Sequence, residues 1–465
     1  MKVEIFVAPG LMAMQHEVML FAATGLLIGG IDDALIDILY LIRAGWRRLF
    51  VYSRHPRMTT ATLPPPTQPG PLAVFLPAWH EAEIIGATLR GMLRQWQGQD
   101  FRLFVGTYPN DAATIDAVAD VAAGEERIQL VIHDQPGPTT KADCLNRLWS
   151  AMLRDEAERQ GRYKAIVLHD AEDVVHTDEL RLLSVMIERF DMVQLPVRPL
   201  MNQNSQWIAG HYADEFAESH GKYMIAREAL GAAVPSAGVG CAFSRDILVR
   251  LAADRGETVF DPYSLTEDYE IGLHIANLGG RTVFVRMQDA DGELVCTQEH
   301  FPDTLEASVR QKARWMTGIA LAGWDRMGWQ GGVTEVWMRL HDRRAPLSAI
   351  VLFAAYLSTL LYGAELLFTM FAGRAARPLP PFLGSILSIT GMLMFWRLSF
   401  RAWITGHTYG WRQGLMAPPR AIIANIIALL AARRAMTIYI RQIRGGTIIW
   451  DKTMHRPISA DRTAM

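Results

Sequence analysis

The sequence predicts an α/β domain with a parallel sheet, flanked on both sides by membrane-spanning and interfacial helices. Short apolar runs typical of strands alternate with helical segments between Leu72 and Leu168, at the spacing of βαβ units. Half of the 465 residues are hydrophobic, and long apolar stretches lie towards both ends of the chain. Stretches of that length are typical of membrane helices, so we expect a soluble middle held between membrane segments.

These features divide the chain into four parts. Residues 1–63 are predicted to form an N-terminal membrane helix with a basic flank, and the proline-rich residues 64–71 a stiff linker. We expect the α/β domain in residues 72–330. Residues 331–465 are then the C-terminal membrane and interfacial helices with a cytoplasmic tail.

The apolar stretch from Leu11 to Leu41 is predicted to cross the membrane, because it is too long for the core of a signal peptide. Asp33 and Asp37 interrupt it four residues apart, on one helical face, and should therefore face protein rather than lipid. Five arginines follow within residues 43–57, and the positive-inside rule places them in the cytoplasm. A helix lying on the membrane surface is the alternative for this stretch.

Three apolar stretches follow the α/β domain. Residues 347–371 are long enough to span a bilayer, and residues 382–396 form a shorter, weaker span. Arginines then begin with Arg397 and Arg401, which suggests a cytoplasmic loop. Residues 421–432 are too short to span, so an interfacial or re-entrant helix is expected there. Three spans with the N-terminus outside would place the C-terminus in the cytoplasm.

Charge and cysteine usage restrict the class of protein further. The net charge of −2 gives no field that would favour nucleic acid as a partner. Cys144, Cys241 and Cys296 form no CxxC pair, and their odd number fits a reducing compartment better than a disulfide scaffold.

The chemistry is expected to centre on Asp170, Glu172 and Asp173, which follow the apolar run from Ile166 to Leu168. A buried strand that ends in polar residues delivers them to the carboxyl edge of a sheet, where α/β proteins bind ligands. Carboxylates so close repel each other unless a cation lies among them, and Mg²⁺ prefers carboxylate and phosphate oxygens. The three acids indicate a divalent-metal site for a phosphorylated substrate. A solvated acidic turn or a helix N-cap is the alternative.

Two later segments place charged residues on helices. Thr266 is predicted to cap a helix that begins with Glu267 and Asp268, and capping alone is one interpretation of those acids. Further on, three residues share one face of a predicted helix: Gln311, Arg314 and Trp315. An amphipathic helix on the surface before the membrane is the alternative for this segment.

Together, four motifs resemble those of the family-two glycosyltransferases, the membrane-embedded relatives of cellulose and hyaluronan synthases. The motifs are Phe75-Leu-Pro-Ala-Trp-His-Glu81, Asp170-Ala-Glu172-Asp173, Thr266-Glu267-Asp268 and Gln311-Lys-Ala-Arg314-Trp315. The resemblance covers Leu72 to Trp315, extends through the membrane helices, and implies a GT-A-type, Rossmann-like α/β domain. A narrower similarity, to the bacteriophage-adsorption protein B type of inner-membrane glycosyltransferase, rests on Gly106-Thr-Tyr-Pro-Asn-Asp111, Gly238-Val-Gly240 and Trp450-Asp-Lys-Thr453.

The resemblance implies roles in donor binding for the first two motifs. Asp170 and Glu172, with Asp173 beside them, would hold Mg²⁺ or Mn²⁺ against a nucleotide diphosphate. Glu81 and Asp111 follow the first two strands, where the family recognises uracil and ribose.

The resemblance also implies the remaining site residues. Asp268 would be the base that deprotonates the acceptor hydroxyl, and Lys141 and Arg314 would contact the diphosphate. For Lys141, a solvent-exposed loop lysine is the alternative. The acceptor end would be lined by Glu267, Gln311, Arg314 and Trp315.

The expected protein is an inverting, metal-dependent glycosyltransferase of the bacterial inner membrane, with its catalytic domain in the cytoplasm. It would transfer sugar from a nucleotide-diphosphate sugar, with a UDP-sugar favoured, to a growing glycan, and feed the product between its membrane helices. The alternatives are a single transfer to a lipid carrier and a catalytically silent membrane scaffold that serves phage adsorption. An outer-membrane partner, for export or as a receptor, would fit these roles.

Overall fold

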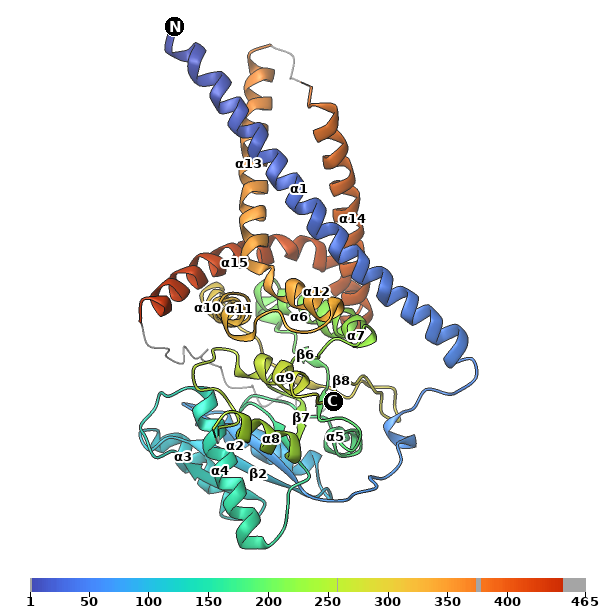
Figure 1. Ribbon diagram of the computed structural model, residues 1–465, viewed down its shortest axis with the longest axis vertical. Helices are drawn as coiled ribbons and strands as arrows, with labels where there is room; N and C mark the ends of the chain where they lie inside the picture. Colours follow the sequence, from blue (N-terminus) through green and yellow to red (C-terminus); the bar gives the residue numbers. More distant parts are fainter. Residues whose placement is uncertain (1, 257, 374–377, 446–465) are drawn as a thin grey trace.

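The computed structural model describes residues 2–256, 258–373 and 378–445, with side chains from residue 13 onward. The predicted motif Trp450-Asp-Lys-Thr453 lies outside the described residues. An α/β domain forms one end of the molecule, and long helices extend from it at the other end (Figure 1). Shorter helices and one long transverse helix, α15 (Trp411–Ile443), lie between these two parts (Figure 1).

The main sheet has seven strands in the order β3-β2-β1-β4-β7-β5-β8. The first four are parallel in this order, as predicted, but β7 runs antiparallel to both β4 and β5, so the sheet is mixed and not wholly parallel. The strands are β1 (Leu72–Pro77), β2 (Phe101–Thr107), β3 (Ile128–Ile132), β4 (Ala165–Leu168), β5 (Met192–Gln194), β7 (Cys241–Ser244) and β8 (Thr282–Phe284).

The antiparallel strand follows from the turn before it. Gly238 and Gly240 both have positive φ, at +80° and +56°, conformations that glycine adopts without steric cost. They turn the chain so that Cys241, the first residue of β7, pairs with Leu168, the last residue of β4. This turn therefore lies at the carboxyl edge of β4, beside the acids Asp170, Glu172 and Asp173. A second, two-stranded sheet pairs β6 (Val197–Pro199) with β9 (Thr297–Glu299).

Alternation along the strands gives the sheet two apolar faces. In β1, Leu72, Val74 and Leu76 join the core cluster beneath one set of helices, whereas Ala73 and Phe75 join the cluster on the opposite face. The first face is covered by α2 (Ile85–Gln95), α3 (Ala112–Ala122) and α5 (Glu179–Met186), and the second by α4 (Lys141–Arg159), α8 (Arg245–Asp254) and α9 (Glu267–Asn277).

The remaining elements connect this domain to the long helices. The elements are η1 (Arg47–Val51), η2 (Thr60–Thr62), η3 (Gln203–Ser205), α6 (Ile208–Glu218), η4 (Ser219–Tyr223), α7 (Met224–Ala229), α10 (Leu305–Trp315), η5 (Met316–Ala322), α11 (Gly323–Met327) and α12 (Val333–Arg343). Both η4, which joins α6 to α7, and η5, which follows α10, are π-helices.

Three helices in the described parts of the chain are long and apolar enough to cross a membrane: α13 (Ala345–Phe371), α14 (Pro381–Tyr409) and α15. The N-terminal helix α1 (Lys2–Trp46) is not among them, although it runs beside α13 and α14 (Figure 1). Met19 and Ala23 of α1 pack against Leu383 and Ile386 of α14. A membrane crossing by α1 stays a prediction.

Two expectations for the C-terminal helices were wrong in extent. The span predicted to end at Trp396 continues to Tyr409, so Arg397 and Arg401 lie within α14 rather than in a loop. The helix continues because partners satisfy both charges: Arg397 pairs with Asp33 of α1, and Arg401 with Glu218 of α6.

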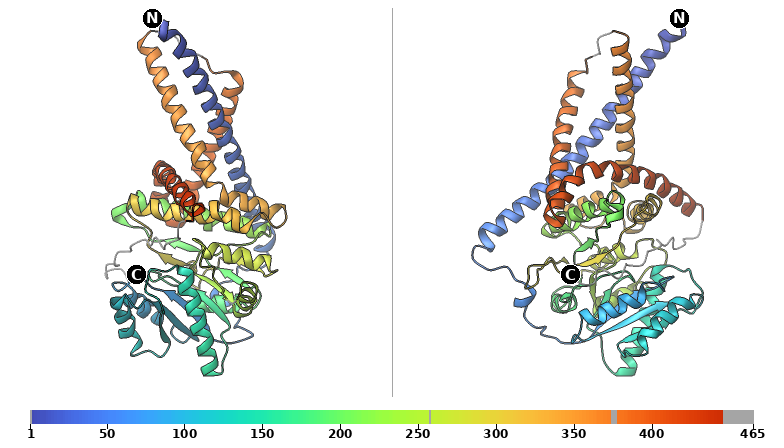
Figure 2. Two further views of the ribbon diagram at one scale, coloured as in Figure 1. Left: turned by 60° about the vertical axis from the view of Figure 1, so that its left-hand side comes forward. Right: turned by 180° about the vertical axis from the view of Figure 1, so that it is seen from behind.

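The apolar run at residues 421–432 is likewise only the middle of a longer helix, the 33-residue α15. By composition this helix could cross a bilayer. It lies across the ends of α13 and α14, however, in the orientation of an interfacial helix (Figures 1 and 2).

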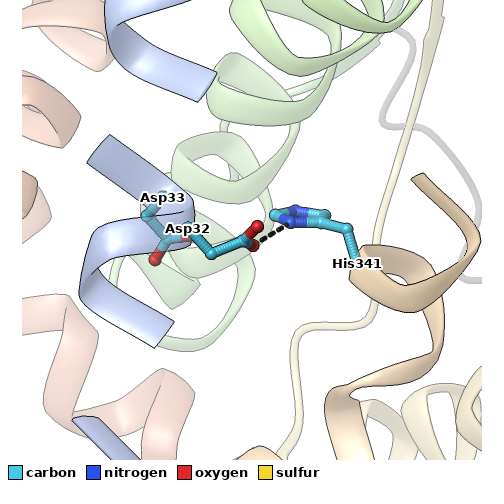
Figure 3. A group of neighbouring side chains, drawn as sticks. All are labelled: Asp32, Asp33 and His341. Carbon is cyan, nitrogen blue, oxygen red and sulfur yellow. Dashed lines mark hydrogen bonds and ion pairs between the residues drawn. The ribbon is translucent and has the colours of Figure 1, made fainter. Parts of the chain in front are cut away.

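Acidic residues in α1 join it to the other helices at a charged junction. Asp32, Asp33 and His341 lie together, with His341 Nδ1 2.7 Å from Asp32 Oδ2 (Figure 3). Arg344 contacts both carboxylates, at 2.6 Å from Asp32, and Arg397 pairs with Asp33. Because arginines already compensate these carboxylates, the group acts as an ion-pair junction between α1, α12 and α14 rather than as a metal site.

The prediction that Asp33 and Asp37 face protein is confirmed. Asp37 is fully buried and lies 2.5 Å from Nζ of Lys222 in η4. Asp33 is 8% exposed and meets the two arginines of the junction. Charges inside an apolar helix therefore bind it to the α/β domain and to α14.

A buried ion pair attaches α15 to α6, and its removal is expected to be costly. Arg420 Nη2 lies 2.8 Å from Asp214 Oδ1, and both side chains are almost completely buried. We expect Arg420→Ala to destabilise the protein by about 3–5 kcal/mol, because it leaves a buried carboxylate without its partner. Chemical unfolding in detergent micelles, followed by circular dichroism, measures this change.

The double variant Arg420→Met/Asp214→Leu removes both charges and is the control. It should cost less than Arg420→Ala alone, since no charge is left uncompensated in the interior. An Arg420→Ala protein as stable as the wild type would contradict this account of how α15 is attached.

Candidate active site

A cavity opens at the carboxyl edge of β1 and β4 and contains most of the predicted site residues. It is lined by Glu81, Lys141, Asp170, Glu172, Glu267, Asp268, Gln311, Arg314 and Trp315, together with residues that were not predicted. These side chains come from the ends of β1 and β4, the start of α4, the start of α9 and the end of α10. Of the predicted residues, Asp111 and Asp173 are not in the lining.

The acid run follows β4, as expected, and its first carboxylate is paired. Asp170 Oδ1 lies 2.6 Å from Lys141 Nζ. Lys141 is the first residue of α4 and not a loop residue, because Thr140 and Asp143 form a capping box that starts the helix there. Burial acts to lower the pKa of Lys141, but the carboxylates of Asp170, Glu267 and Asp268 outweigh it and raise that pKa.

Asp173 does not line the cavity, and one of its oxygens takes part in the turn after β4. Its Oδ2 accepts a hydrogen bond from the backbone N–H of Asp170 at 3.0 Å and lies 2.7 Å from His169 Nδ1. The other ring nitrogen of His169 lies 2.9 Å from Glu179 Oε1. Burial lowers the pKa of His169, but these two carboxylates raise it to about 10. His169 thus bridges the buried carboxylates of Asp173 and Glu179.

Asp111 also has a structural position. It caps α3 by accepting from the N–H of Thr114, and its Oδ2 accepts from the N–H of His80 at 2.6 Å. Glu81, its predicted companion, does line the cavity. So does Trp79, which was not predicted and packs edge-to-face on Tyr108 with ring centroids 5.0 Å apart. Its place inside the Phe75–Glu81 motif was the available signal.

The predicted helix at Glu267 is α9, and its first turn carries two buried acids into the cavity. Thr266 occupies the N-cap position, but its side chain makes no capping hydrogen bond. Asp268 Oδ1 instead accepts from the N–H of Tyr269 at 2.7 Å. Burial and the neighbouring Asp268 raise the pKa of Glu267 to about 7, and burial raises the pKa of Asp268 against the opposing charge of Lys141.

On the other side, α10 presents Gln311, Arg314 and Trp315 to the cavity from one face, as predicted. Glu299, at the end of β9, also lines it and was missed. Burial and the carboxylates of Asp173, Glu172 and Asp170 raise the pKa of Glu299 well above its usual range. A single acid at the end of a three-residue strand gives no sequence signal of its own.

A second cavity begins where the first ends. The two share Ala237, Thr266, Asp268 and Trp315 in their linings. From there the second cavity runs between the α/β domain and the long helices, reaching Arg344, Arg397 and Arg401. Asp268 therefore lies at the junction of a pocket over the sheet and a passage towards the membrane helices.

The donor atoms of the first cavity suit a hard divalent cation. Asp170, Glu172 and Glu299 supply carboxylate oxygens, which Mg²⁺ and Mn²⁺ prefer. The raised pKa of Glu299 reflects the crowding of negative charge there, which a cation would relieve. The chemical type of these donors thus suits a hard divalent cation.

Comparison with known proteins places the chain in a family. Residues 69–318, more than half of the chain, match the family model described as "Glycosyltransferase like family 2". The chain is 36% identical over 456 residues to "Bacteriophage adsorption protein B" of Escherichia coli K12, and equally to "Bacteriophage N4 adsorption protein B" of Escherichia coli O157:H7. The alignment covers 92% of this chain and 60% of each of these relatives.

The fold is also similar to a solved structure. "Mannosyltransferase PcManGT from Pyrobaculum calidifontis in complex with GDP-Man and Mn2+" superposes with a TM-score of 0.51 over 91% of this chain and 99% of that one, at 15% sequence identity. At this identity the similarity establishes the GT-A-type fold alone. The family model, which matches more than half of the chain, shows that the chain belongs to the family-two glycosyltransferases, which transfer sugars from nucleotide-sugar donors.

Proposed function

We propose that this protein transfers a sugar, with inversion, from a UDP-sugar to a growing glycan at the cytoplasmic face of the bacterial inner membrane. The observation that carries the proposal is the position of Asp268, where a pocket rich in carboxylates meets a passage towards the membrane helices. A donor held over the sheet and an acceptor entering from the membrane side would meet at this carboxylate. The basic flank of α1 supports the cytoplasmic side.

Donor binding is assigned to the sheet side of the pocket. Asp170 and Glu172 would hold Mg²⁺ or Mn²⁺, which when bound neutralises negative charge developing on the departing diphosphate. Lys141 and Arg314 would contact the same diphosphate as positive charges. Glu81 lines the end of the pocket at β1, where the nucleoside would lie, and Asp111 would act there only through the His80 backbone that it holds.

Acceptor activation is assigned to Asp268. Its carboxylate would take the proton of the acceptor hydroxyl as that oxygen forms a bond to the anomeric carbon and the bond to the diphosphate breaks. One direct displacement of this kind inverts the anomeric configuration. Glu267, Gln311 and Trp315 would orient the acceptor sugar, with Trp315 providing an apolar face.

Extension of a glycan is favoured over a single transfer because the passage continues beyond the site of transfer. The second cavity starts at Asp268 and Trp315 and extends to Arg397 and Arg401 of α14. A product could move into it and present its new end to the next donor. The names of the relatives are those of phage-adsorption proteins, which supports an outer-membrane partner that displays or exports such a product.

Metal-dependent turnover of a nucleotide sugar tests the proposal. Purified protein in nanodiscs would be given UDP- and GDP-sugars, and release of nucleoside diphosphate would be followed with Mg²⁺, Mn²⁺ or EDTA. We expect release with one UDP-sugar and a divalent metal, lost in EDTA and reduced at least about 100-fold by Asp170→Asn or Asp268→Asn. Asp120→Asn, on the exposed surface of α3, should match the wild type.

The products distinguish the alternatives. A polydisperse labelled product indicates glycan extension, whereas a discrete, lipid-extractable one indicates a single transfer to a lipid carrier. Full biological function of an Asp268→Asn protein would instead favour a scaffold and contradict the enzymatic proposal.

The rate should depend on pH through the two acids of α9. A base acts in its deprotonated form, and burial raises the pKa of both Glu267 and Asp268, that of Glu267 to about 7. We therefore expect kcat to rise with increasing pH as this pair of acids loses a proton, near the pKa of about 7 of Glu267, and to be lost as the pair takes that proton up again at lower pH. Glu267→Gln should shift this rise in kcat to lower pH, because it removes the negative neighbour of Asp268. An unchanged pH dependence of kcat in that variant would contradict the assignment of the rise to these two acids.

A close glycine contact is expected to set the space available to Asp268. A Cβ atom added to Gly238 would lie 2.5 Å from Asp268 Oδ2, and the residue has φ +80°. Gly238→Ala should therefore displace the carboxylate and lower kcat by at least about tenfold, besides costing about 1–2 kcal/mol in backbone strain. Turnover and unfolding temperature together measure the two effects.

Gly231→Ala is the matched control for this change. Gly231 has a similar φ of +71°, but a Cβ atom there would meet nothing within 4 Å. It should lose stability to a similar degree and keep its kcat. Equal losses of kcat in both variants would show that backbone strain, rather than displacement of Asp268, is responsible.

A further inference from the structure

The first turn of α9 carries Asp268 without the usual anchor at a helix start. Thr266 occupies the N-cap position and its side chain makes no capping hydrogen bond. A capping side chain normally accepts a hydrogen bond from the free N–H groups of a helix's first turn, so another contact must hold the first turn of α9. Tyr269, the residue after Asp268, provides such a contact.

Tyr269 joins the turn to α12. Its hydroxyl donates to Asp342 Oδ2 at 2.7 Å, and its backbone N–H donates to Asp268 Oδ1, also at 2.7 Å. One residue thus binds the catalytic carboxylate through its main chain and a distant helix through its side chain. Because the tyrosine ring is rigid, fixing its hydroxyl also fixes the amide that orients Asp268.

Asp342 is itself held firmly. Arg227 Nη1 donates to its Oδ2 at 2.7 Å, and the hydroxyl of Tyr223 donates to its Oδ1 at 2.7 Å. Arg227 is fully buried, and Asp342 is 9% exposed. Burial acts to raise the pKa of Asp342, but Arg227 and the two tyrosine hydroxyls outweigh it and lower that pKa, so the carboxylate stays ionised as an acceptor.

We propose that Asp342 of α12 is a positioning residue for sugar transfer, acting through Tyr269 to hold Asp268 at the acceptor hydroxyl. This inference rests on the proposed function of Asp268. Asp342 lies outside residues 69–318, the part of the chain that matches the glycosyltransferase family model. The helix that precedes the membrane segment α13 thereby becomes part of the catalytic apparatus, and a shift of α12 would reach the base through two hydrogen bonds.

The decisive variant is Tyr269→Phe, which keeps the ring and removes the hydroxyl. We expect kcat to fall by tenfold to 100-fold, as for a catalytic group moved by about 1 Å. The KM for the acceptor and the dissociation constant of UDP with Mn²⁺, measured by calorimetry, should stay within twofold of wild type, because the donor side of the pocket is untouched.

Tyr163→Phe is the matched control. Tyr163 is buried, and its hydroxyl donates to Asp155 Oδ2 at 2.6 Å in the α/β core, away from the cavity. It should lose a similar amount in unfolding temperature and keep its kcat. If Tyr269→Phe and Tyr163→Phe lower kcat equally, or if Tyr269→Phe also abolishes UDP binding, its role is structural and the proposal is wrong.

A double-mutant cycle tests the path through Asp342. Asp342→Ala should lower kcat in the same direction, and adding Tyr269→Phe to it should lower kcat no further, since the Tyr269 hydroxyl then has no acceptor on residue 342 to lose. Independent, multiplying losses would overturn the proposal. Wild type and Asp268→Asn run in the same assay: an inactive wild type would count against the proposed function, whereas an active wild type with unaffected Tyr269→Phe would count against this inference alone.

Discussion

The site depends on one ion pair in a crowded acidic cavity. Lys141 lies 2.6 Å from Asp170, and the carboxylates of Glu267 and Asp268 act on the same ammonium group. These acids come from different elements, β4 and α9, and without positive charge their repulsion would separate the edges of the cavity. On the proposed function, Asp170 would hold the metal ion, and Lys141 would contact the diphosphate of the donor instead of Asp170.

The sequence predicted the part of the fold that arises from local pattern. Apolar runs and helical periodicity located β1, β2, β3 and β4 and the helices between them, because these elements form successive βαβ units. The direction of β7 could not be predicted that way. Its four residues, Cys241–Ser244, look like any short strand, and the reversal depends on the φ angles of Gly238 and Gly240. The continuation of α14 to Tyr409 was missed for a related reason, since only the fold brings Asp33 and Glu218 to its arginines.

The site was predictable to the extent that its residues stand in motifs. Asp170, Glu172, Asp268 and Trp315 all line the cavity as their motifs indicated. Asp173 and Asp111 show the limit of that approach, since both stand in motifs and yet lie outside the cavity lining, where each makes hydrogen bonds within a turn. Glu299 and Asp342 have no motif around them in the sequence. Only the fold shows that Glu299 lines the cavity and that Asp342 binds the hydroxyl of Tyr269.

The acids in α1 are best explained by the same spatial argument. A carboxylate in an apolar helix is costly in a membrane and usually marks a functional site. In this protein Asp37 meets Lys222 of the α/β domain, and Asp33 meets Arg397 of α14. Lys222 belongs to η4, which directly precedes α7, the helix that supplies Arg227 to Asp342. Asp37 of α1 thus pairs with η4, and the helix after η4 supplies Arg227 to Asp342, the residue that binds the Tyr269 hydroxyl. On the proposed function, the ion pair between α1 and Lys222 therefore lies next to the residues that hold Asp268, because Lys222 directly precedes Tyr223 and lies in the segment before Arg227. A loosely attached α1 is then expected to disturb the placement of Asp268.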